Sequence, residues 1–240
     1  SLSSAAGLSA SGLVDAVDVV PADMAAQVVA WLASPTPGTR MLEVGQGRGT
    51  KSLLLESYAL RRGGLAHIAA VESEAFKVTV SRARMERAGL GKAVTCTALD
   101  GRRLGEKDLL PELSGSFDSA FVDAPCSGTG VMAGKPDVKY RVTAEDVDAL
   151  ATTQQALLET CCRYVKPGGQ LVYSTCSILP EENALQLRRF LENHPDFTLL
   201  PLPDSFPAAL RERYGAEGLQ LLPHRDHLDG FFIARMGRKP

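Results

Sequence analysis

Short apolar runs and longer stretches with helical periodicity alternate along almost the whole chain. Apolar runs of strand length predict strands at residues 40–44, 65–72, 94–99, 116–123, 170–174 and 231–235. Helical periodicity predicts helices at residues 14–33, about 50–62, 74–88, 143–165 and 180–193, with a turn at 166–169. Strands and helices that alternate at these lengths form a mostly parallel sheet with helices on both faces. We therefore expect a doubly wound α/β fold.

The first predicted helix is amphipathic and ends in the Pro- and Gly-rich residues 34–38. Its expected inward positions are Val14, Val17, Met24, Val28, Trp31 and Leu32. We expect one compact domain, in which a helical segment over residues 1–38 packs on a catalytic α/β part over residues 39–240. Ligands of such sheets bind beyond the carboxyl ends of the strands, where the strand order reverses. The loops after the predicted strands are therefore the candidate site.

Composition excludes several classes of protein. Of the 240 residues, 45% are hydrophobic and 22% are charged, as in ordinary globular domains. The N-terminal residues do not resemble a signal peptide, and no apolar run approaches the roughly 18 residues needed to span a bilayer. Five cysteines, without metal-binding spacing, predict reduced thiols in a cytoplasmic protein. His224 and His227 lack a complete ligand set, so no metal is expected.

A glycine-rich loop follows the first predicted strand, in the sequence Glu43-Val44-Gly45-Gln46-Gly47-Arg48-Gly49-Thr50-Lys51. Glycines let the backbone turn tightly and approach a cofactor, and the helix that follows presents free N–H groups. Such a loop suits a dinucleotide as well as S-adenosylmethionine. An acidic residue just before the loop favours the cationic end of a cofactor, because it would repel a pyrophosphate.

Acidic residues also end the second and third predicted strands. Glu72 is placed to accept hydrogen bonds from ribose hydroxyls, and Asp100 to meet an adenine amino group. Each could by itself be an ordinary solvated carboxylate. Together they are stronger evidence for a ligand site, because Glu43, Glu72 and Asp100 end three successive strands on the ligand side.

Two polar loops carry cysteines. The sequences are Asp123-Ala124-Pro125-Cys126-Ser127-Gly128-Thr129-Gly130 after the fourth strand and Tyr173-Ser174-Thr175-Cys176-Ser177 after the next, followed by Pro180-Glu181-Glu182-Asn183. Structural cysteines are usually buried among apolar residues, which fits Cys96, Cys161 and Cys162. Cys126 and Cys176 do not fit that description. We expect both to lie at the same crevice.

These motifs closely resemble the Nop/Sun family of RNA cytosine-5 methyltransferases, which includes bacterial ribosomal-RNA enzymes of the RsmB and RsmF type. The likeness runs from about residue 12 to 236 and includes PDVKY at 136–140 and DGFFIAR at 229–235. It implies the Rossmann-like, seven-stranded fold of S-adenosylmethionine-dependent methyltransferases, S-adenosylmethionine as cofactor bound by residues 43 and 45–51, Glu72, Asp100 and Asp123, and RNA as partner, ribosomal rather than transfer RNA. Where the family reads Cys-Ala-Ala-Pro-Gly-Gly-Lys, only Gly49 and Lys51 are retained.

The resemblance also implies roles for individual residues. Cys176 is implied as the nucleophile that adds to cytosine carbon 6, and Cys126 as a helper in the later removal of the carbon-5 proton or release of product. Asp123 is expected at ring nitrogen 3. A helix starting near Pro180 is expected to lower the pKa of the Cys176 thiol through its positive end. Lys51 either balances the carboxylates or is a plain surface lysine.

The sequence alone does not decide which residues contact RNA or which of three functions the protein has. The net charge of −2 argues against a surface that is basic all over, so RNA would need a local basic stripe or a further domain absent from this chain. The candidate residues are Arg82, Arg84, Arg87, Lys135, Lys139 and Arg141. One rival is a DNA cytosine methyltransferase with Cys126 as nucleophile, which leaves Cys176 unexplained. Another is a non-catalytic RNA-binding or assembly factor, which the altered cofactor loop leaves possible.

Overall fold

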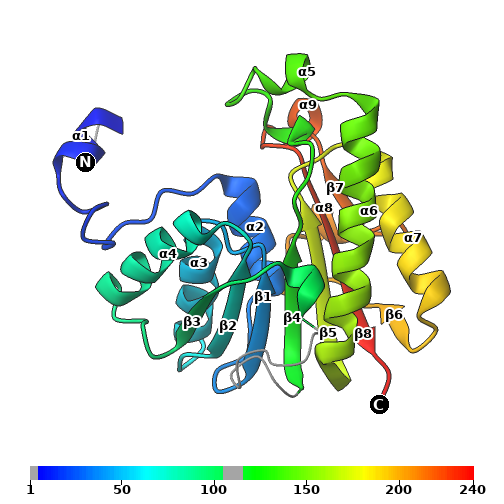
Figure 1. Cartoon of the computed structure of the whole chain (residues 1–240), viewed down its shortest axis with the longest axis horizontal. Coiled ribbons are helices and arrows are strands. Elements are labelled where there is room, and N and C mark those ends of the chain that lie inside the picture. Colours follow the sequence, from blue (N-terminus) through cyan, green and yellow to red (C-terminus); the bar gives the residue numbers. More distant parts are fainter. Residues whose placement is uncertain (1–4, 105–115) are drawn as a thin grey trace.

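An eight-stranded sheet runs through the computed structural model, which describes residues 5–104 and 116–240 (Figure 1). The strands are β1 (Arg40–Val44), β2 (His67–Glu72), β3 (Val94–Ala98), β4 (Phe117–Asp123), β5 (Val165–Thr175), β6 (Phe197–Leu199), β7 (Leu219–Leu221) and β8 (Phe231–Arg238). Their order is β3-β2-β1-β4-β5-β8-β6, and β7 pairs with β8 off this path. Strands β1 to β5 pair in parallel, whereas β8 is antiparallel to its neighbours. The predicted doubly wound, mostly parallel sheet is confirmed.

Helices cover both faces of this sheet. The α-helices are α1 (Ala5–Ala10), α2 (Met24–Ala33), α3 (Thr50–Leu60), α4 (Ala75–Arg87), α5 (Val138–Arg141), α6 (Ala144–Cys161), α7 (Ala184–Asn193), α8 (Ala208–Arg211) and α9 (Pro223–Asp226). Short 3-10 helices are η1 (Gly101–Arg103), η3 (Thr129–Val131), η4 (Cys162–Tyr164) and η5 (Pro180–Glu182). Helices α2, α3 and α4 pack on one face, and α6 and α7 on the other (Figure 1). Successive residues of β1, Met41 and Leu42, accordingly belong to opposite cores.

The predicted N-terminal helix is wrong in its first half. The Asp23 side chain accepts hydrogen bonds from the backbone N–H groups of Ala25 (2.7 Å) and Ala26 (3.3 Å), so α2 begins at Met24. Val14 and Val17 lie in the turns that precede it. Met24 is 62% exposed and does not face the core. The apolar periodicity of the sequence thus extends beyond the N-terminal end of the helix. The Asp23 cap and Pro21, not the periodicity, set the residue at which the helix begins.

Three other local predictions need correction. The expected turn at 166–169 lies inside β5, where the register against β4 shifts between Phe117 and Ser119. The expected helix over 180–193 is divided into η5 and α7, because Asn183 leaves helical geometry with φ −122° and ψ −102°. The sheet has eight strands where seven were expected, since β7 adds a short strand to β8. Strands β6 and β7, of three residues each, are too short to produce a readable pattern.

Candidate active site

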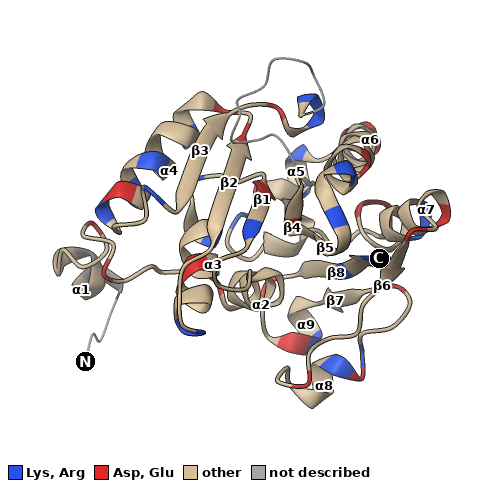
Figure 2. Cartoon of the chain, turned by 90° about the horizontal axis from the view of Figure 1, so that it is seen from below, with Lys and Arg blue, Asp and Glu red and all other residues tan. Residues whose placement is uncertain are grey.

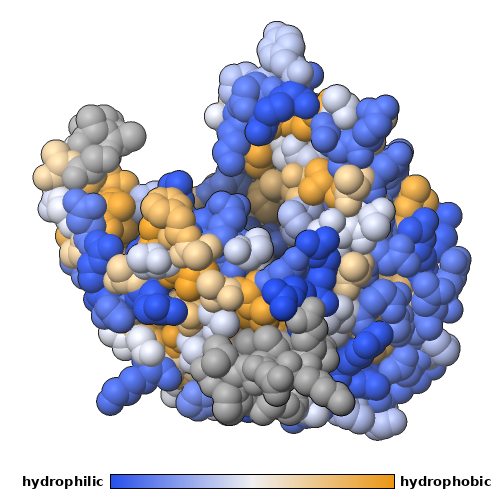
Figure 3. All heavy atoms as spheres, in the orientation of Figure 1, coloured by the Kyte–Doolittle hydropathy of each residue, from blue (hydrophilic) through white to orange (hydrophobic). Residues whose placement is uncertain are grey.

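The two cysteines singled out in the sequence meet at the carboxyl ends of two parallel strands. Figure 3 shows that the face of the molecule drawn there is hollowed. Cys126 follows β4 and Cys176 follows β5, and these strands are parallel neighbours. Their Sγ atoms are 3.2 Å apart, within hydrogen-bond distance for sulfur. Cys96, Cys161 and Cys162 are buried, as predicted for structural thiols.

The two thiols have opposite electrostatic surroundings. The hydrogen bond shared with Cys126 lowers the pKa of Cys176, and Lys51 and Lys135 lower it further against burial and the charge of Asp123. The same hydrogen bond, together with burial, raises the pKa of Cys126 well above its ordinary value. The pair therefore favours a Cys176 thiolate beside a Cys126 thiol. The helix expected near Pro180 is the three-residue 3-10 helix η5, and the longer helix α7 begins only at Ala184.

A lysine and a carboxylate stand beside this pair. Lys51 Nζ lies 2.6 Å from Asp123 Oδ2 and 5.4 Å from the centre of the Phe231 ring. Burial acts to lower the pKa of Lys51, but the neighbouring Asp123 and Cys176 charges raise it above its ordinary value. Lys51 is therefore an active-site cation rather than a plain surface lysine.

The loop that carries Cys126 is anchored by a buried carboxylate. Glu182 has no exposed surface, and its oxygens accept hydrogen bonds from the Ser127 N–H (2.8 Å), the Ser127 hydroxyl (2.6 Å) and the Gln154 amide (3.0 Å). Gln154 also donates to the Pro125 carbonyl at 2.9 Å. A buried carboxylate with three donors holds its partners firmly. Cys126 thus stands between two tethered residues.

The loop that carries Cys176 is anchored by the neighbouring amide. The Thr175 hydroxyl donates to Asn183 Oδ1 at 2.5 Å, and Asn183 Nδ2 donates to the Ser177 carbonyl (2.9 Å) and to Gln220 Oε1 (2.7 Å). Cys176 lies between Thr175 and Ser177, so this one side chain holds both of its flanks. Glu182 and Asn183 belong to the Pro-Glu-Glu-Asn run of the sequence, whose pattern alone predicts no anchoring role for either residue. Gln154 and Gln220 carried no sequence signal, since their partners are distant in the chain.

A glycine contact joins three loops around the thiols. Gly130 N donates to the Cys176 carbonyl at 2.9 Å, and Gly230 N donates to the Gly130 carbonyl at 2.8 Å. A Cβ on Gly130 would lie 2.0 Å from the Gly230 oxygen and 2.8 Å from the Cys176 oxygen. Backbones can approach this closely only without side chains. The contact explains why glycine stands at these points of both motifs.

The glycine-rich loop borders a cavity of about 290 Å³ next to the thiols. Among the residues that line it are Gly45, Gly47, Glu72, Asp100 and Asp123. Glu72 accepts hydrogen bonds from the N–H groups of Gly47 (2.8 Å) and Glu74 (3.0 Å), which fixes the loop against β2. Gly45 has φ 84°, and a Cβ there would lie 2.1 Å from the Asp123 carbonyl oxygen. The Asp100 carboxylate lies 2.5 Å from the Arg102 guanidinium, which lowers the pKa of Asp100.

Two candidate cofactor residues lie beneath the loop instead of on the cavity wall. Glu43 is fully buried and accepts a hydrogen bond from the Ser52 hydroxyl at 2.7 Å. Gln46 donates to Ser52 (3.0 Å) and to the Cys96 sulfur (3.3 Å). Burial raises the pKa of Glu43 to about 8, against the hydrogen bond from Ser52. Glu43 and Gln46 therefore support the loop from inside the core.

The remaining loop residues face α4. The Arg84 guanidinium donates to the Arg48 carbonyl (2.8 Å) and the Thr50 hydroxyl (3.0 Å). A Cβ on Gly49 would lie 2.5 Å from the Ser81 hydroxyl oxygen. This packing, with φ 79° at Gly49, accounts for the glycine that this chain retains.

The candidate RNA-binding residues separate into two groups. Arg82 donates to the Cys96 carbonyl (2.8 Å) and Arg87 to the Asp15 carbonyl (2.8 Å), so these arginines, like Arg84, connect parts of the protein. In contrast, the second group lies on and near α5, beside the thiols. Lys139 lies 4.7 Å from the ring centre of Tyr140, which is 80% exposed.

Neither a metal cluster nor a spanning helix is found among residues 5–104 and 116–240. No three His, Cys, Asp or Glu side chains in this part of the chain are grouped so as to hold a metal ion. No helix there is long and apolar enough to cross a membrane.

Comparison with known proteins decides the family. The model of the family described as 16S rRNA methyltransferase RsmB/F matches residues 29–237. The chain belongs to this family. The predicted kinship with RsmB- and RsmF-type proteins is confirmed.

Individual relatives agree with this assignment. Ribosomal RNA small subunit methyltransferase B of Pasteurella multocida is 36% identical over 89% of this chain and 46% of its own length. Ribosomal RNA small subunit methyltransferase F of Serratia proteamaculans is 36% identical over 87% of this chain and 42% of its own length. The chain thus spans about half the length of the curated relatives it matches. A methyltransferase homologue from Pyrococcus horikoshii superimposes with a TM-score of 0.70 at 28% identity, over 90% of this chain and 67% of that one. The fold is the Rossmann-like fold of S-adenosylmethionine-dependent methyltransferases.

Proposed function

We propose that this chain is the catalytic part of an enzyme that uses S-adenosylmethionine to form 5-methylcytosine in RNA, with small-subunit ribosomal RNA as the substrate. The observation that carries the proposal is the thiol pair, with Sγ atoms 3.2 Å apart and with opposite pKa shifts. Attack on a pyrimidine needs a thiolate, and its later release needs a second group that handles a proton.

The cavity beside the thiols suits the cofactor. S-adenosylmethionine, when bound, supplies an electrophilic methyl group on a sulfonium. The carboxylate of Glu72 is available to ribose hydroxyls, and Asp123 borders both the cavity and the thiol pair. Gly47, with φ 59° and open space where a Cβ would lie, lets the backbone approach a ligand without a side chain in the way. Glu43 supports this loop from below.

The proposed steps use this chain's own side chains. The Cys176 thiolate forms a bond to cytosine carbon 6, and the electron pair of the carbon 5–carbon 6 double bond moves to carbon 5. Carbon 5 would then take the methyl group, and the methyl–sulfur bond that breaks would leave its electron pair on the sulfur of the cofactor. Loss of the carbon-5 proton to solvent restores the double bond, and the carbon–sulfur bond to carbon 6 breaks to release Cys176 as thiolate. The Cys126 thiol assists this second half by a hydrogen bond to the departing sulfur, and the ion pair of Asp123 and Lys51 faces the charge that develops on the ring.

The rival mechanism with Cys126 as nucleophile is disfavoured by electrostatics. The pKa of Cys126 is raised by its hydrogen bond with Cys176 and by burial, so this group is the poorer source of thiolate. A non-catalytic factor, in turn, would have no use for a thiol pair held by Glu182 and Asn183.

The names of the relatives support the choice of RNA substrate and of cellular location. Both curated relatives described above are named as small-subunit ribosomal RNA methyltransferases, which favours ribosomal over transfer RNA. Ribosomal subunits mature in the bacterial cytoplasm, and we place the protein there without a resident metal. The α/β part from residue 39 onward then carries the chemistry, and α2 packs against it. Bisulfite sequencing of ribosomal and transfer RNA from a deletion strain tests the choice of RNA.

Replacement of each thiol tests the mechanism. Cys176→Ala should abolish methyl transfer and any covalent RNA adduct. Cys126→Ala should still transfer the methyl group but accumulate a protein–RNA conjugate, visible as a slow band on a denaturing gel. Cys161→Ala, a buried thiol away from the site, is the control and should behave as the wild type. A conjugate in Cys176→Ala but not in Cys126→Ala would reverse the two roles, and no conjugate in any variant would point to a non-catalytic protein.

A further inference from the structure

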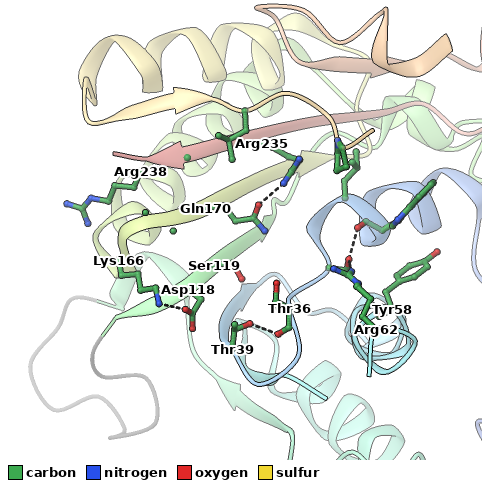
Figure 4. Close-up of a pocket in the computed structure, with 18 of the residues that line it drawn as sticks. Thr36, Thr39, Tyr58, Arg62, Asp118, Ser119, Lys166, Gln170, Arg235 and Arg238 are labelled. Carbon is green, nitrogen blue, oxygen red and sulfur yellow. Dashed lines mark hydrogen bonds and ion pairs between the residues drawn. The ribbon is translucent and has the colours of Figure 1, made fainter. Parts of the chain in front are cut away.

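A second large cavity lies at the opposite end of the sheet from the thiols (Figure 4). It is lined by residues at the start of β4, such as Ser119, and of β5, such as Gln170, whereas Asp123 and Cys176 stand at and beyond the ends of these strands. Its volume is about 1240 Å³, above the roughly 300–1000 Å³ of usual small-molecule pockets. The cavity has no part in the chemistry proposed above.

The cavity is basic although the chain as a whole is slightly acidic. Its charged lining residues are Arg61, Arg62, Lys166, Arg235, Arg238, Lys239 and a single acid, Asp118. Asp118 is neutralised within the protein, because it pairs with Lys166 and accepts a hydrogen bond from the Arg40 N–H at 2.8 Å. The net charge of the whole chain is −2. A positive concavity on such a molecule is a local feature rather than a consequence of composition.

Three arginines of the cavity have no carboxylate partner within residues 5–104 and 116–240. The half-buried Arg235 guanidinium donates only to neutral groups, Gln170 Oε1 (3.0 Å) and the Pro201 carbonyl (2.9 Å). Arg62 donates to the Ser34 hydroxyl and to the Tyr58 carbonyl (3.2 Å). The Arg61 side chain has no hydrogen-bond or ion-pair partner in this described part.

Uncompensated guanidinium groups in a concave site favour an anionic ligand. Burial of a positive charge without a counter-charge costs free energy, and burial accordingly lowers the pKa of Arg235. The neutral hydrogen bonds hold the Arg235 side chain in place on the cavity wall, where Figure 4 shows it directed toward Gln170. Guanidinium groups match phosphate oxygens with paired hydrogen bonds.

Aromatic side chains in the same cavity indicate which class of anionic ligand the cavity suits. Trp31 and Tyr58, both partly exposed, line the same cavity as the arginines. Arginines that track a phosphate backbone beside aromatic rings that stack on bases are the usual means of binding single-stranded nucleic acid. A cavity of this size has room for a chain of nucleotides rather than one small anion.

We propose that this cavity binds a single-stranded segment of the RNA substrate, with backbone phosphates on Arg61, Arg62 and Arg235 and a base against Trp31. The inference rests on the proposed function for the choice of RNA as ligand. It adds a second RNA contact across the sheet from the reacting cytosine. Such a contact would position a substrate that spans the molecule, and it would hold RNA whether or not the methyl donor is bound.

Trp31 is the only tryptophan of the chain, so its fluorescence reports on this cavity alone. We expect a 12-nucleotide oligouridine RNA to quench the Trp31 emission in a saturable way, because a stacked base lies against the ring. The double variant Arg61→Glu/Arg62→Glu should raise the Kd at least about tenfold through loss of phosphate contacts. The matched control Arg188→Glu/Arg189→Glu reverses two adjacent charges on α7, away from the cavity, and should keep the wild-type Kd within about twofold.

Further variants in the same experiment distinguish an error in the proposed RNA site from an error in the proposed function. Arg61→Glu alone should also weaken quenching, and its exposed side chain makes a folding defect unexpected, which circular dichroism checks. Cys176→Ala and Glu72→Ala should leave quenching unchanged, because they alter only the opposite edge of the sheet. Quenching without any methyl transfer would refute the proposed function and leave the RNA site standing. Absence of quenching, or equal quenching in Arg61→Glu/Arg62→Glu, would overturn the site even if adducts form.

Discussion

Two sulfur atoms with the same covalent chemistry differ in pKa because of their immediate partners. Cys126 and Cys176 share a hydrogen bond that lowers the pKa of Cys176, and Lys51 and Lys135 add positive charge near Cys176. Asp123 opposes this effect but is itself paired with Lys51 at 2.6 Å. The division between thiolate and thiol therefore depends on a single hydrogen bond more than on the general field of the site.

Removal of that hydrogen bond should raise the pKa of Cys176. In Cys126→Ala the thiolate loses its donor, so alkylation of Cys176 by iodoacetamide should need a higher pH than in the wild type. Cys126→Ser, which keeps a hydroxyl donor, is the matched control and should shift the profile less. Peptide mass spectrometry at a series of pH values measures the rate at Cys176 alone. A profile unchanged in Cys126→Ala would show that the lysines, not Cys126, set this pKa.

Glu43 provides a test through stability. Burial raises its pKa from 4.5 to about 8, so the folded state binds this proton more tightly than the unfolded state. The stabilisation is complete below pH 4.5 and is lost as the pH rises through 8. Relative to Glu43→Gln, the wild type should lose at least about 1.4 kcal/mol of unfolding free energy between pH 5 and pH 8, the equivalent of one pKa unit.

Urea unfolding at pH 5, 6.5 and 8 measures this difference. Glu86→Gln, which changes an exposed carboxylate on α4, is the control and should stay within about 0.5 kcal/mol of the wild type throughout. Parallel stability curves for Glu43→Gln and the wild type would mean that Glu43 is ionised in the folded protein.

At the scale of elements, the site consists of loops that fix one another. The loop after β4 is tied to Glu182, the loop after β5 to Asn183, and both meet the chain just before β8 at Gly130 and Gly230. The short distance between the thiols follows from these ties. Helix α6 borders the cavity through Thr153 and Leu157 and supplies Gln154 as an anchor. Helix α7 begins directly after the anchor Asn183.

Gly130→Ala should disrupt this crossing. The added Cβ would lie 2.0 Å from the Gly230 oxygen, so the loops must separate, at a cost of about 1–3 kcal/mol in unfolding free energy. Adduct formation by Cys176 should fall together with stability. Gly134→Ala is the control, because its Cβ would meet only the Val131 oxygen at 3.9 Å. Thermal unfolding and the denaturing gel measure both effects, and a fully active, stable Gly130→Ala enzyme would contradict the role of the crossing.

At the scale of the whole molecule, charge is mixed rather than segregated. Figure 2 shows basic and acidic residues interspersed over the helices, in keeping with a net charge of −2. Two local features depart from this mixture: the basic cavity at the start of the strands and the exposed Lys139 and Tyr140 on α5 beside the thiols. Binding of RNA would use a few phosphate contacts at these places.

We therefore expect this chain alone to bind RNA weakly and with strong salt dependence. A few phosphate contacts on a single strand should cost about tenfold in affinity between 50 mM and 200 mM salt. Fluorescence anisotropy of a labelled RNA over this range measures the slope. Tight binding that persists at high salt would reveal a mainly apolar RNA surface that neither the basic cavity nor α5 explains.

The sequence by itself determined the order of the longer strands and helices, because alternation of apolar and polar residues reflects which face of each element is buried. The short strands β6 and β7 escaped it. It also identified the cysteine loops, since their polar surroundings are local and can be read from consecutive residues. Only the tertiary structure decided that Cys126 and Cys176 share a hydrogen bond, that Glu43 lies inside the core, and that an arginine-lined cavity exists across the sheet. Each of these depends on residues far apart in the chain that the parallel strands bring together, and pairing at such distances leaves no periodic trace in a single sequence.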